Sequence, residues 1–107
     1  MAARATISDM QCELLVSAAS AWEISTKVRI GKMPEAQALE TRFVEWMLIA
    51  GYTLLPVTVQ HGLTAGRLMG THRDPFDRMI AAQALALDIP VISKDKKLDE
   101  FGVTRIW

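Results

Sequence analysis

The stretch Met69-Gly-Thr-His-Arg-Asp-Pro-Phe-Asp-Arg-Met-Ile-Ala-Ala-Gln83 constrains this chain most, because it joins a polar loop to an apolar helix through two aspartates. Pro75 suits the first helical position, where a missing N–H is no loss, and Asp74 suits the N-cap. Asp77 then falls on the third helical position, where the positive end of the helix dipole favours an acid. Helix capping and a functional role are both open for this pair.

The composition favours one domain over residues 1–107 and excludes several classes of protein. Twelve basic and twelve acidic side chains cancel, so any nucleic-acid site must come from a local cluster of charges. The single Cys12 excludes an internal disulfide and a cysteine-based zinc site, and predicts a reducing, cytoplasmic compartment. We expect no membrane span, because the most apolar tract, 46–57, falls short of the roughly 20 residues that a bilayer requires. The N-terminus lacks the apolar segment of a secretory signal.

Short apolar runs alternate with helical patterns along the chain. We expect strands at 13–17, 52–57, 91–93 and 103–107, and helices at about 3–11, 20–29, 35–50, 58–69 and 74–86. Ser20 and Glu23 have the spacing of a capping box, and Thr58 suits an N-cap. Trp46 is expected in the core or at an interface. Strands that alternate with helices predict an α/β fold with three layers, α/β/α, around a mostly parallel sheet.

Acids gather where such a sheet binds ligands, beyond the carboxyl ends of its strands. Glu23 follows the strand at 13–17, and Asp95 follows the strand at 91–93. Asp77 begins the helix that leads into the strand at 91–93, so a plain crossover puts it at the opposite edge unless the loop at 71–73 folds over. Clustered acids need a cation, and oxygen-only ligands suit Mg²⁺ or Mn²⁺. The chemistry implied is phosphodiester hydrolysis.

Basic side chains surround these acids despite the neutral total. They would contact phosphates without reading sequence, and ordinary solvated charges are the alternative. The basic side chains are Lys27, Arg29, Lys32, His72, Arg73, Arg78, Lys94, Lys96 and Lys97. We expect the isolated His61 to be a surface or core residue rather than a metal ligand.

Three motifs resemble, in order and spacing, those of PIN-domain proteins, specifically the VapC-type toxins of bacterial toxin–antitoxin pairs. The motifs are Val16-Ser-Ala-Ala-Ser-Ala-Trp-Glu-Ile24, Arg73-Asp-Pro-Phe-Asp-Arg-Met-Ile-Ala-Ala-Gln83 and Val91-Ile-Ser-Lys-Asp95. The resemblance covers residues from about 14 to 107. It implies a Mg²⁺- or Mn²⁺-dependent ribonuclease that cuts structured RNA, such as tRNA or rRNA. It also implies an antitoxin whose C-terminal segment lies across the toxin's groove and holds it inactive.

The resemblance further implies roles for single residues. Glu23, Asp77 and Asp95 match the second, third and fourth acids of the family, which are catalytic metal ligands, and Asp74 matches an accessory metal ligand. In this family the loop before Asp77 brings that acid to the others. Ser93 matches a small hydroxyl residue that orients the site.

The predicted contacts to the substrate are Ser93, Arg73, Arg78 and Lys94.

One part of the family pattern is missing from this chain. The family begins with an apolar strand that ends in aspartate, whereas Met1 falls where the family's first helix would be finishing. Asp9 is no substitute, because 6–10 is not a buried strand. We therefore expect an N-terminally truncated PIN-like domain with one metal ligand fewer and with unpaired strand edges, whose buried polar groups would each cost about 1 to 3 kcal/mol.

Three arrangements are compatible with the missing first strand. The remaining strands close up, a second copy or an antitoxin supplies the pairing, or the chain is a fragment of a longer product. Unpaired edges and apolar faces favour association, so we expect a homodimer or a larger assembly.

Two other functions compete with a truncated, weakened ribonuclease. One is a catalytically inactive PIN-like module that binds an antitoxin, or itself, through helices carrying Trp22, Phe43 and Trp46. The other is a receiver-like phospho-acceptor domain, for which Lys94 would serve but the required aspartate at a central strand end is missing.

Overall fold

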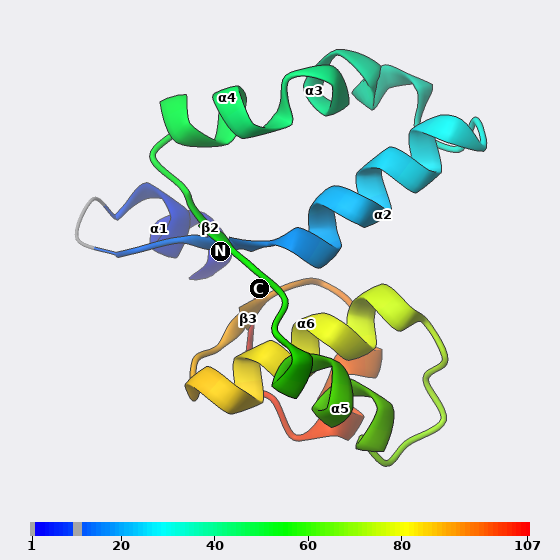
Figure 1. Cartoon of the computed structure of the whole chain (residues 1–107). Helices are drawn as coiled ribbons and strands as arrows, with labels where there is room; N and C mark the ends of the chain where they lie inside the picture. Colours follow the sequence, from blue (N-terminus) through cyan, green and yellow to red (C-terminus); the bar gives the residue numbers. More distant parts are fainter. Residues whose placement is uncertain (1, 10–11) are drawn as a thin grey trace. The chain divides into compact units, whose positions relative to one another are not determined.

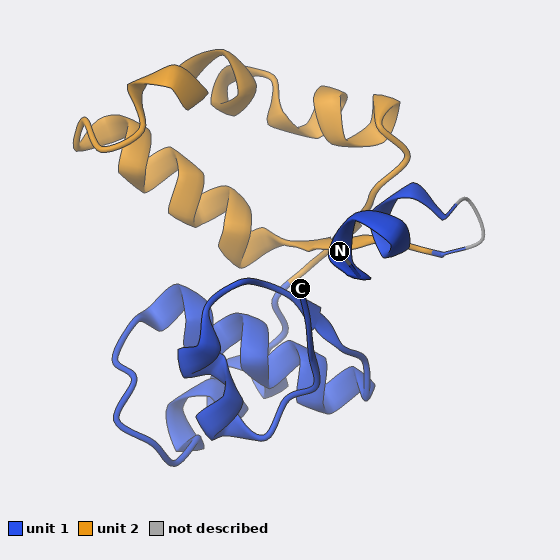
Figure 2. Cartoon of the chain, turned by 180° about the vertical axis from the view of Figure 1, so that it is seen from behind, with its two compact units in different colours: residues 1–12, 57–107 blue, residues 13–56 orange. Residues whose placement is uncertain are grey.

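The computed structural model of this protein describes residues 2–9 and 12–107. The chain divides into two compact units, which Figure 2 shows in different colours. One consists of residues 13–56, and the other of residues 1–12 and 57–107. We call them the middle unit and the C-terminal unit. A single domain over 1–107 stays a prediction, because compact units are not by themselves separate domains.

The middle unit contains a pair of parallel strands followed by helices (Figure 1). Strand β1 (Leu15–Ser17) pairs with β2 (Thr53–Leu55), with the strand ends Leu15 and Thr53 opposite each other. Helix α2 (Ala18–Arg29) follows β1 directly and packs against the short helices η1 (Pro34–Ala36) and α3 (Gln37–Thr41). Helix α4 (Phe43–Ile49) leads back to β2.

The predicted capping box at Ser20 is wrong, because α2 begins at Ala18. The hydroxyl of Ser17 accepts a hydrogen bond from the backbone N–H of Ala19 at 3.0 Å. Ser17 is the last residue of β1, so its side chain starts the helix as soon as the strand ends. The predicted end at Arg29 is confirmed.

The single helix predicted at 35–50 is also wrong. The chain leaves helical geometry at Arg42 (φ −125°, ψ 38°), between α3 and α4. The hydroxyl of Thr41 donates to the carbonyl of Gln37 at 3.0 Å, a side-chain bond that competes with the helix and bends it. Trp46 is 46% exposed, so the core interpretation of this residue is wrong and the interface interpretation stays a prediction.

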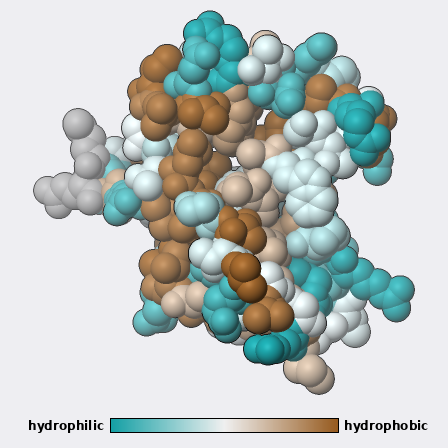
Figure 3. Space-filling view, in the orientation of Figure 1, coloured by the Kyte–Doolittle hydropathy of each residue, from teal (hydrophilic) through white to brown (hydrophobic). Residues whose placement is uncertain are grey.

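Exposed apolar side chains gather on α4, as the brown surface at the upper left of Figure 3 shows. On this helix Val44, Leu48 and Ile49 have exposed fractions of 55%, 63% and 74%.

The C-terminal unit packs two helices beside a second pair of strands (Figure 1). Its elements are α1 (Ala2–Ser8), α5 (Val59–Arg67), α6 (Pro75–Leu87), β3 (Val91–Ile92), η2 (Lys96–Phe101) and β4 (Arg105–Ile106). Helices α5 and α6 pack together, and β3 runs parallel to β4. The buried side chains of Ala81, Leu98 and Phe101 form the core, which joins α6 to η2.

Local capping fixes the start of α5. The hydroxyl of Thr58 accepts from the backbone N–H of His61, and the His61 ring accepts from the backbone N–H of Thr58, both at 3.1 Å. Gln83 lies against the same ring at 3.3 Å. His61 is buried, so its interpretation as a core residue is confirmed. The helix ends at Arg67, two residues before the predicted end.

The described strands form two separate two-stranded parallel sheets. The predicted α/β fold with parallel strands is confirmed, and the expected loss of an N-terminal strand stays a prediction. Within the described residues, no helix has the length and apolar character needed to cross a membrane.

Candidate metal centre

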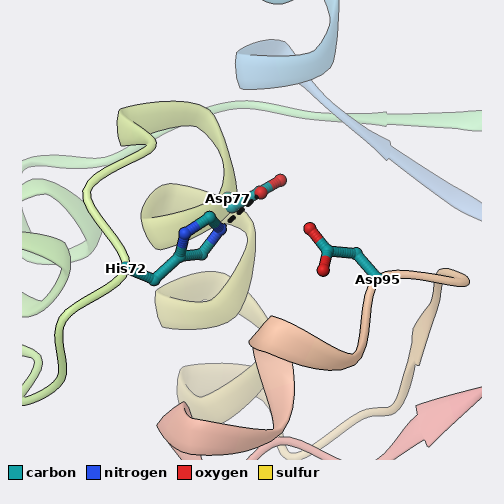
Figure 4. A group of neighbouring side chains, drawn as sticks. All are labelled: His72, Asp77 and Asp95. Atoms are coloured by element: carbon teal, nitrogen blue, oxygen red, sulfur yellow. Dashed lines mark hydrogen bonds and ion pairs between the residues drawn. The ribbon is translucent and has the colours of Figure 1, made fainter.

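Three side chains of the C-terminal unit converge on one point, as Figure 4 shows. His72, Asp77 and Asp95 each offer a ligand atom, and these atoms lie within 4.8 Å of one another. All three side chains are partly buried. Asp77 therefore lies beside Asp95, beyond the end of β3, and not at the opposite edge. The loop before α6 folds over, as the family resemblance implied.

The start of α6 places Asp77. Asp74 is the N-cap, and its Oδ1 accepts from the backbone N–H groups of Phe76 at 2.9 Å and of Asp77 at 3.3 Å. Pro75 occupies the first turn, as predicted. This capping points the Asp77 side chain out of the first turn. Asp74 is outside the converging group of three, so its capping role is the one that the structure favours.

Asp95 is fixed by a turn at the end of β3. Its backbone N–H donates to the hydroxyl of Ser93 at 3.1 Å, and its Oδ1 accepts from the backbone N–H of Lys97 at 3.0 Å. The second bond caps η2. Ser93 thus touches the backbone of the acid that the resemblance says it orients.

His72 is the member of the group that sequence reasoning missed as a partner of the acids. Its Nε2 lies 2.7 Å from Oδ2 of Asp77, and the two side chains are only 12% and 23% exposed. The sequence pattern places His72 only among the basic residues near the acids. The available signal was its place in the polar loop just before the N-cap of α6.

Glu23, the third predicted acid, lies on α2 in the middle unit. Its carboxylate accepts from Lys27 Nζ at 2.7 Å, one helical turn further on, and its side chain is 22% exposed. Its role beside Asp77 and Asp95 stays a prediction.

Arg78 has a different environment from the one expected of a phosphate contact. Its guanidinium donates to three backbone carbonyls, those of Ala65, Leu68 and His72, and lies 5.5 Å from the ring centre of Phe101. These bonds fasten the loop before α6 to the end of α5, which favours a structural role for Arg78.

The remaining basic side chains border the loop. A hollow of about 380 Å³ is lined by Thr71, His72, Arg73, Lys96, Lys97 and Glu100. Arg73 and Lys94, two of the predicted substrate contacts, are exposed. Within the described residues, neither makes a hydrogen bond or an ion pair, so both are free to meet an anion.

Glu100 binds the loop before α6 through two hydrogen bonds. Its carboxylate accepts from the backbone N–H of His72 at 2.6 Å and from the hydroxyl of Thr71 at 3.4 Å. The backbone N–H of His72 holds the pKa of Glu100 below its ordinary value. Gly70 allows this approach, because a Cβ there would lie 2.8 Å from Oε1 of Glu100.

The donor set fits a hard divalent cation. Mg²⁺ typically binds through one or two carboxylates and keeps several waters, and Mn²⁺ also prefers oxygen ligands. Asp77 and Asp95 supply two carboxylates from the first turn of α6 and the N-cap of η2. Without a cation, two such acids would repel each other. The arrangement is therefore suited to Mg²⁺ or Mn²⁺.

Comparison with known proteins gives two matches. The family model described as PIN domain matches residues 1–103. Ribonuclease VapC16 of Mycobacterium tuberculosis is 38% identical over 64 residues, which are 60% of this chain and 44% of that protein. The match therefore spans less than half the length of this curated relative. No solved structure matches the chain.

Proposed function

Because this chain belongs to the PIN-domain family, we propose that it is a ribonuclease that hydrolyses RNA phosphodiester bonds with the help of Mg²⁺ or Mn²⁺. The observation that carries the proposal is the convergence of Asp77 and Asp95, with His72, within 4.8 Å. The similarity to a protein named as a ribonuclease supports the same chemistry.

Asp77 and Asp95 would hold the cation, and Glu23 is the third acid that we propose for the same site. A bound Mg²⁺ or Mn²⁺ supplies the positive charge that polarises a phosphodiester and activates water for in-line attack. Ser93 keeps the backbone of Asp95 in place through its 3.1 Å hydrogen bond. The family's first acid has no equivalent in residues 1–107, so we expect weaker activity than a four-acid site would give.

RNA would be held by contacts to its phosphates. Arg73, Lys96 and Lys97 line the hollow that also touches His72, and exposed Lys94 precedes Asp95 in the chain. Such side chains bind the backbone of a nucleic acid without reading its sequence. We keep Arg73 and Lys94 as substrate contacts and assign Arg78 to the support of the loop.

The proposed setting is that of a toxin in a toxin–antitoxin pair. The expected partners are a cognate antitoxin and a second copy of the chain, and the expected compartment is the cytoplasm. The exposed apolar side chains of Val44, Leu48 and Ile49 support an association of this kind.

An RNA cleavage assay with purified protein tests the proposal. We expect cleavage of structured RNA with Mg²⁺ or Mn²⁺, and none with EDTA. Asp77→Asn and Asp95→Asn should each lower the rate by more than the roughly 10- to 100-fold that is typical of outer-shell changes. Glu23→Gln tests the third acid in the same way. Asp99→Asn is the matched control, because this acid pairs with Arg105 outside the group of three.

Two results would contradict the proposal. One is the absence of cleavage at every Mg²⁺ or Mn²⁺ concentration. The other is a cleavage rate in Asp77→Asn and Asp95→Asn that equals the rate in Asp99→Asn, because the two acids would then have no part in the reaction.

The alternative is a PIN-like module that binds an antitoxin, or itself, without turning over RNA. The observation that favours it is the exposure of Trp22 and Trp46, at 60% and 46%, on the middle unit. Tight antitoxin binding without metal-dependent cleavage would identify this function. Loss of that binding in Trp46→Ala, with the fold kept, would place the contact on α4.

A further inference from the structure

His72 is held in place by contacts on several sides. Its backbone N–H donates to Glu100 at 2.6 Å, and its carbonyl accepts from Arg78 Nη1 at 3.1 Å. Its ring stacks on Phe101, with ring centres 6.0 Å apart and an angle of 30° between the planes. A loop residue fixed by two charged side chains and an aromatic ring has little conformational freedom left to lose.

The edge of the His72 ring that faces the acids carries Nε2. Figure 4 shows Nε2 turned toward Asp77, while the other ring nitrogen points away from both carboxylates. The separation of 2.7 Å from Asp77 Oδ2 is that of an N–H donor on a carboxylate. An ionised carboxylate can only accept a hydrogen bond, so the ring nitrogen that meets it donates the proton, and a protonated nitrogen has no lone pair for a metal.

We infer that His72 is a positioning residue for Asp77: it holds one carboxylate oxygen by a hydrogen bond and leaves the other available to bind the cation. The inference rests on the proposed function, since it concerns the same cation. Carboxylates that bind metals are themselves held by hydrogen bonds, and loss of such an outer-shell partner typically lowers metal affinity about 10- to 100-fold. Glu100, Arg78 and Phe101 serve this role indirectly, because they hold His72.

Two substitutions separate the hydrogen bond from the packing of the ring. His72→Phe keeps a flat ring that can stack on Phe101 but removes the donor to Asp77. His72→Gln loses the ring but can place an amide N–H close to the position of Nε2. Neither change touches the backbone bonds to Glu100 and Arg78.

The experiment measures the dissociation constant for Mn²⁺ by electron paramagnetic resonance and isothermal titration calorimetry, without RNA. We expect the unaltered chain to bind Mn²⁺, His72→Phe to bind it about 10-fold or more weakly, and His72→Gln to recover most of the loss. Asp77→Asn should bind most weakly, and Asp99→Asn should bind as the unaltered chain does. Circular dichroism and thermal melts of the metal-free variants show whether the fold is kept.

Three results would overturn the inference. If His72→Phe binds Mn²⁺ as tightly as the unaltered chain, the hydrogen bond has no positioning role, and the proposed function still stands. If electron spin echo spectra show a histidine nitrogen bound directly to Mn²⁺ and lost in His72→Gln, His72 is a ligand instead. If the unaltered chain binds no Mn²⁺ or Mg²⁺, the proposed function fails and the inference fails with it.

Discussion

Arg78 and Arg73 lie on either side of the Asp74 to Asp77 turn, and the structure predicts opposite results when each is replaced by alanine. Arg78 donates to the carbonyls of Ala65, Leu68 and His72, whereas Arg73 is exposed. Arg78→Ala leaves three carbonyl groups without their donor. Arg73→Ala removes no hydrogen bond within the described residues.

The size of the effect follows from those carbonyls. A buried acceptor that loses its partner costs about 1 to 3 kcal/mol, and acceptors that water can reach cost less. Ala65 is buried, while Leu68 and His72 are partly exposed, so we expect Arg78→Ala to lower the free energy of unfolding by about 2 to 4 kcal/mol. That corresponds to a fall of about 10 to 20 °C in the melting temperature. Arg73→Ala should stay within about 0.5 kcal/mol of the unaltered chain and weaken RNA binding instead.

Thermal and urea denaturation followed by circular dichroism measure the stability. Hydrogen exchange on a peptide covering 69–77 tests the loop itself, and its amides should exchange faster in Arg78→Ala. Arg78→Lys is the control for charge, and should recover only part of the loss because an ammonium group lacks the planar fork that serves three carbonyls. Equal melting temperatures for Arg78→Ala and Arg73→Ala would refute the assigned structural role, most clearly if Arg78→Ala also lost RNA binding.

Four further predictions concern the loop and the acids. Asp74→Ala should cost about 1 kcal/mol of stability in urea titrations through loss of the N-cap, whereas Asp74→Asn, which keeps the capping oxygen, should keep both the stability and the Mn²⁺ affinity; a lost affinity in Asp74→Asn would make Asp74 a ligand. Gly70→Ala should destabilise the loop and speed its hydrogen exchange, because φ is +132° there and the new Cβ would meet Glu100; unchanged exchange would show that the close approach of Glu100 to Gly70 does not hold the loop. Glu100→Gln should reduce stability at about pH 7. The difference from the unaltered chain should shrink as the pH falls below the ordinary pKa of a glutamate, because a carboxyl with a lowered pKa in the folded chain stabilises above its ordinary pKa and loses that contribution as the pH falls through the lowered value. Mn²⁺ at about 100 times its dissociation constant for the unaltered chain should add about 2.7 kcal/mol to the stability of that chain and much less to the stability of Asp77→Asn, as thermal melts in both conditions would show.

The sequence by itself determined the family and the local starts of elements. The resemblance to the PIN-domain family is confirmed by the match over residues 1–103. Asp74 and Thr58 cap helices where predicted, because capping bonds join residues within three positions of each other, and Pro75 follows Asp74 in the first turn of α6. At α2 the predicted cap at Ser20 is wrong, because Ser17 caps the helix three residues earlier.

The tertiary structure decided which side chains meet. Asp77 and Asp95 lie at the starts of different helices, and only the packing of α6 beside β3 and η2 brings them together. The contact between His72 and Glu100 spans 28 positions in the chain, so no periodicity or local motif encodes it. Arg73 and Arg78 look alike in the sequence, but the hydrogen bonds from Arg78 to three backbone carbonyls favour a structural role for Arg78 alone. Local hydrogen bonds can be read from neighbouring residues, whereas the partners of a loop depend on how distant segments pack.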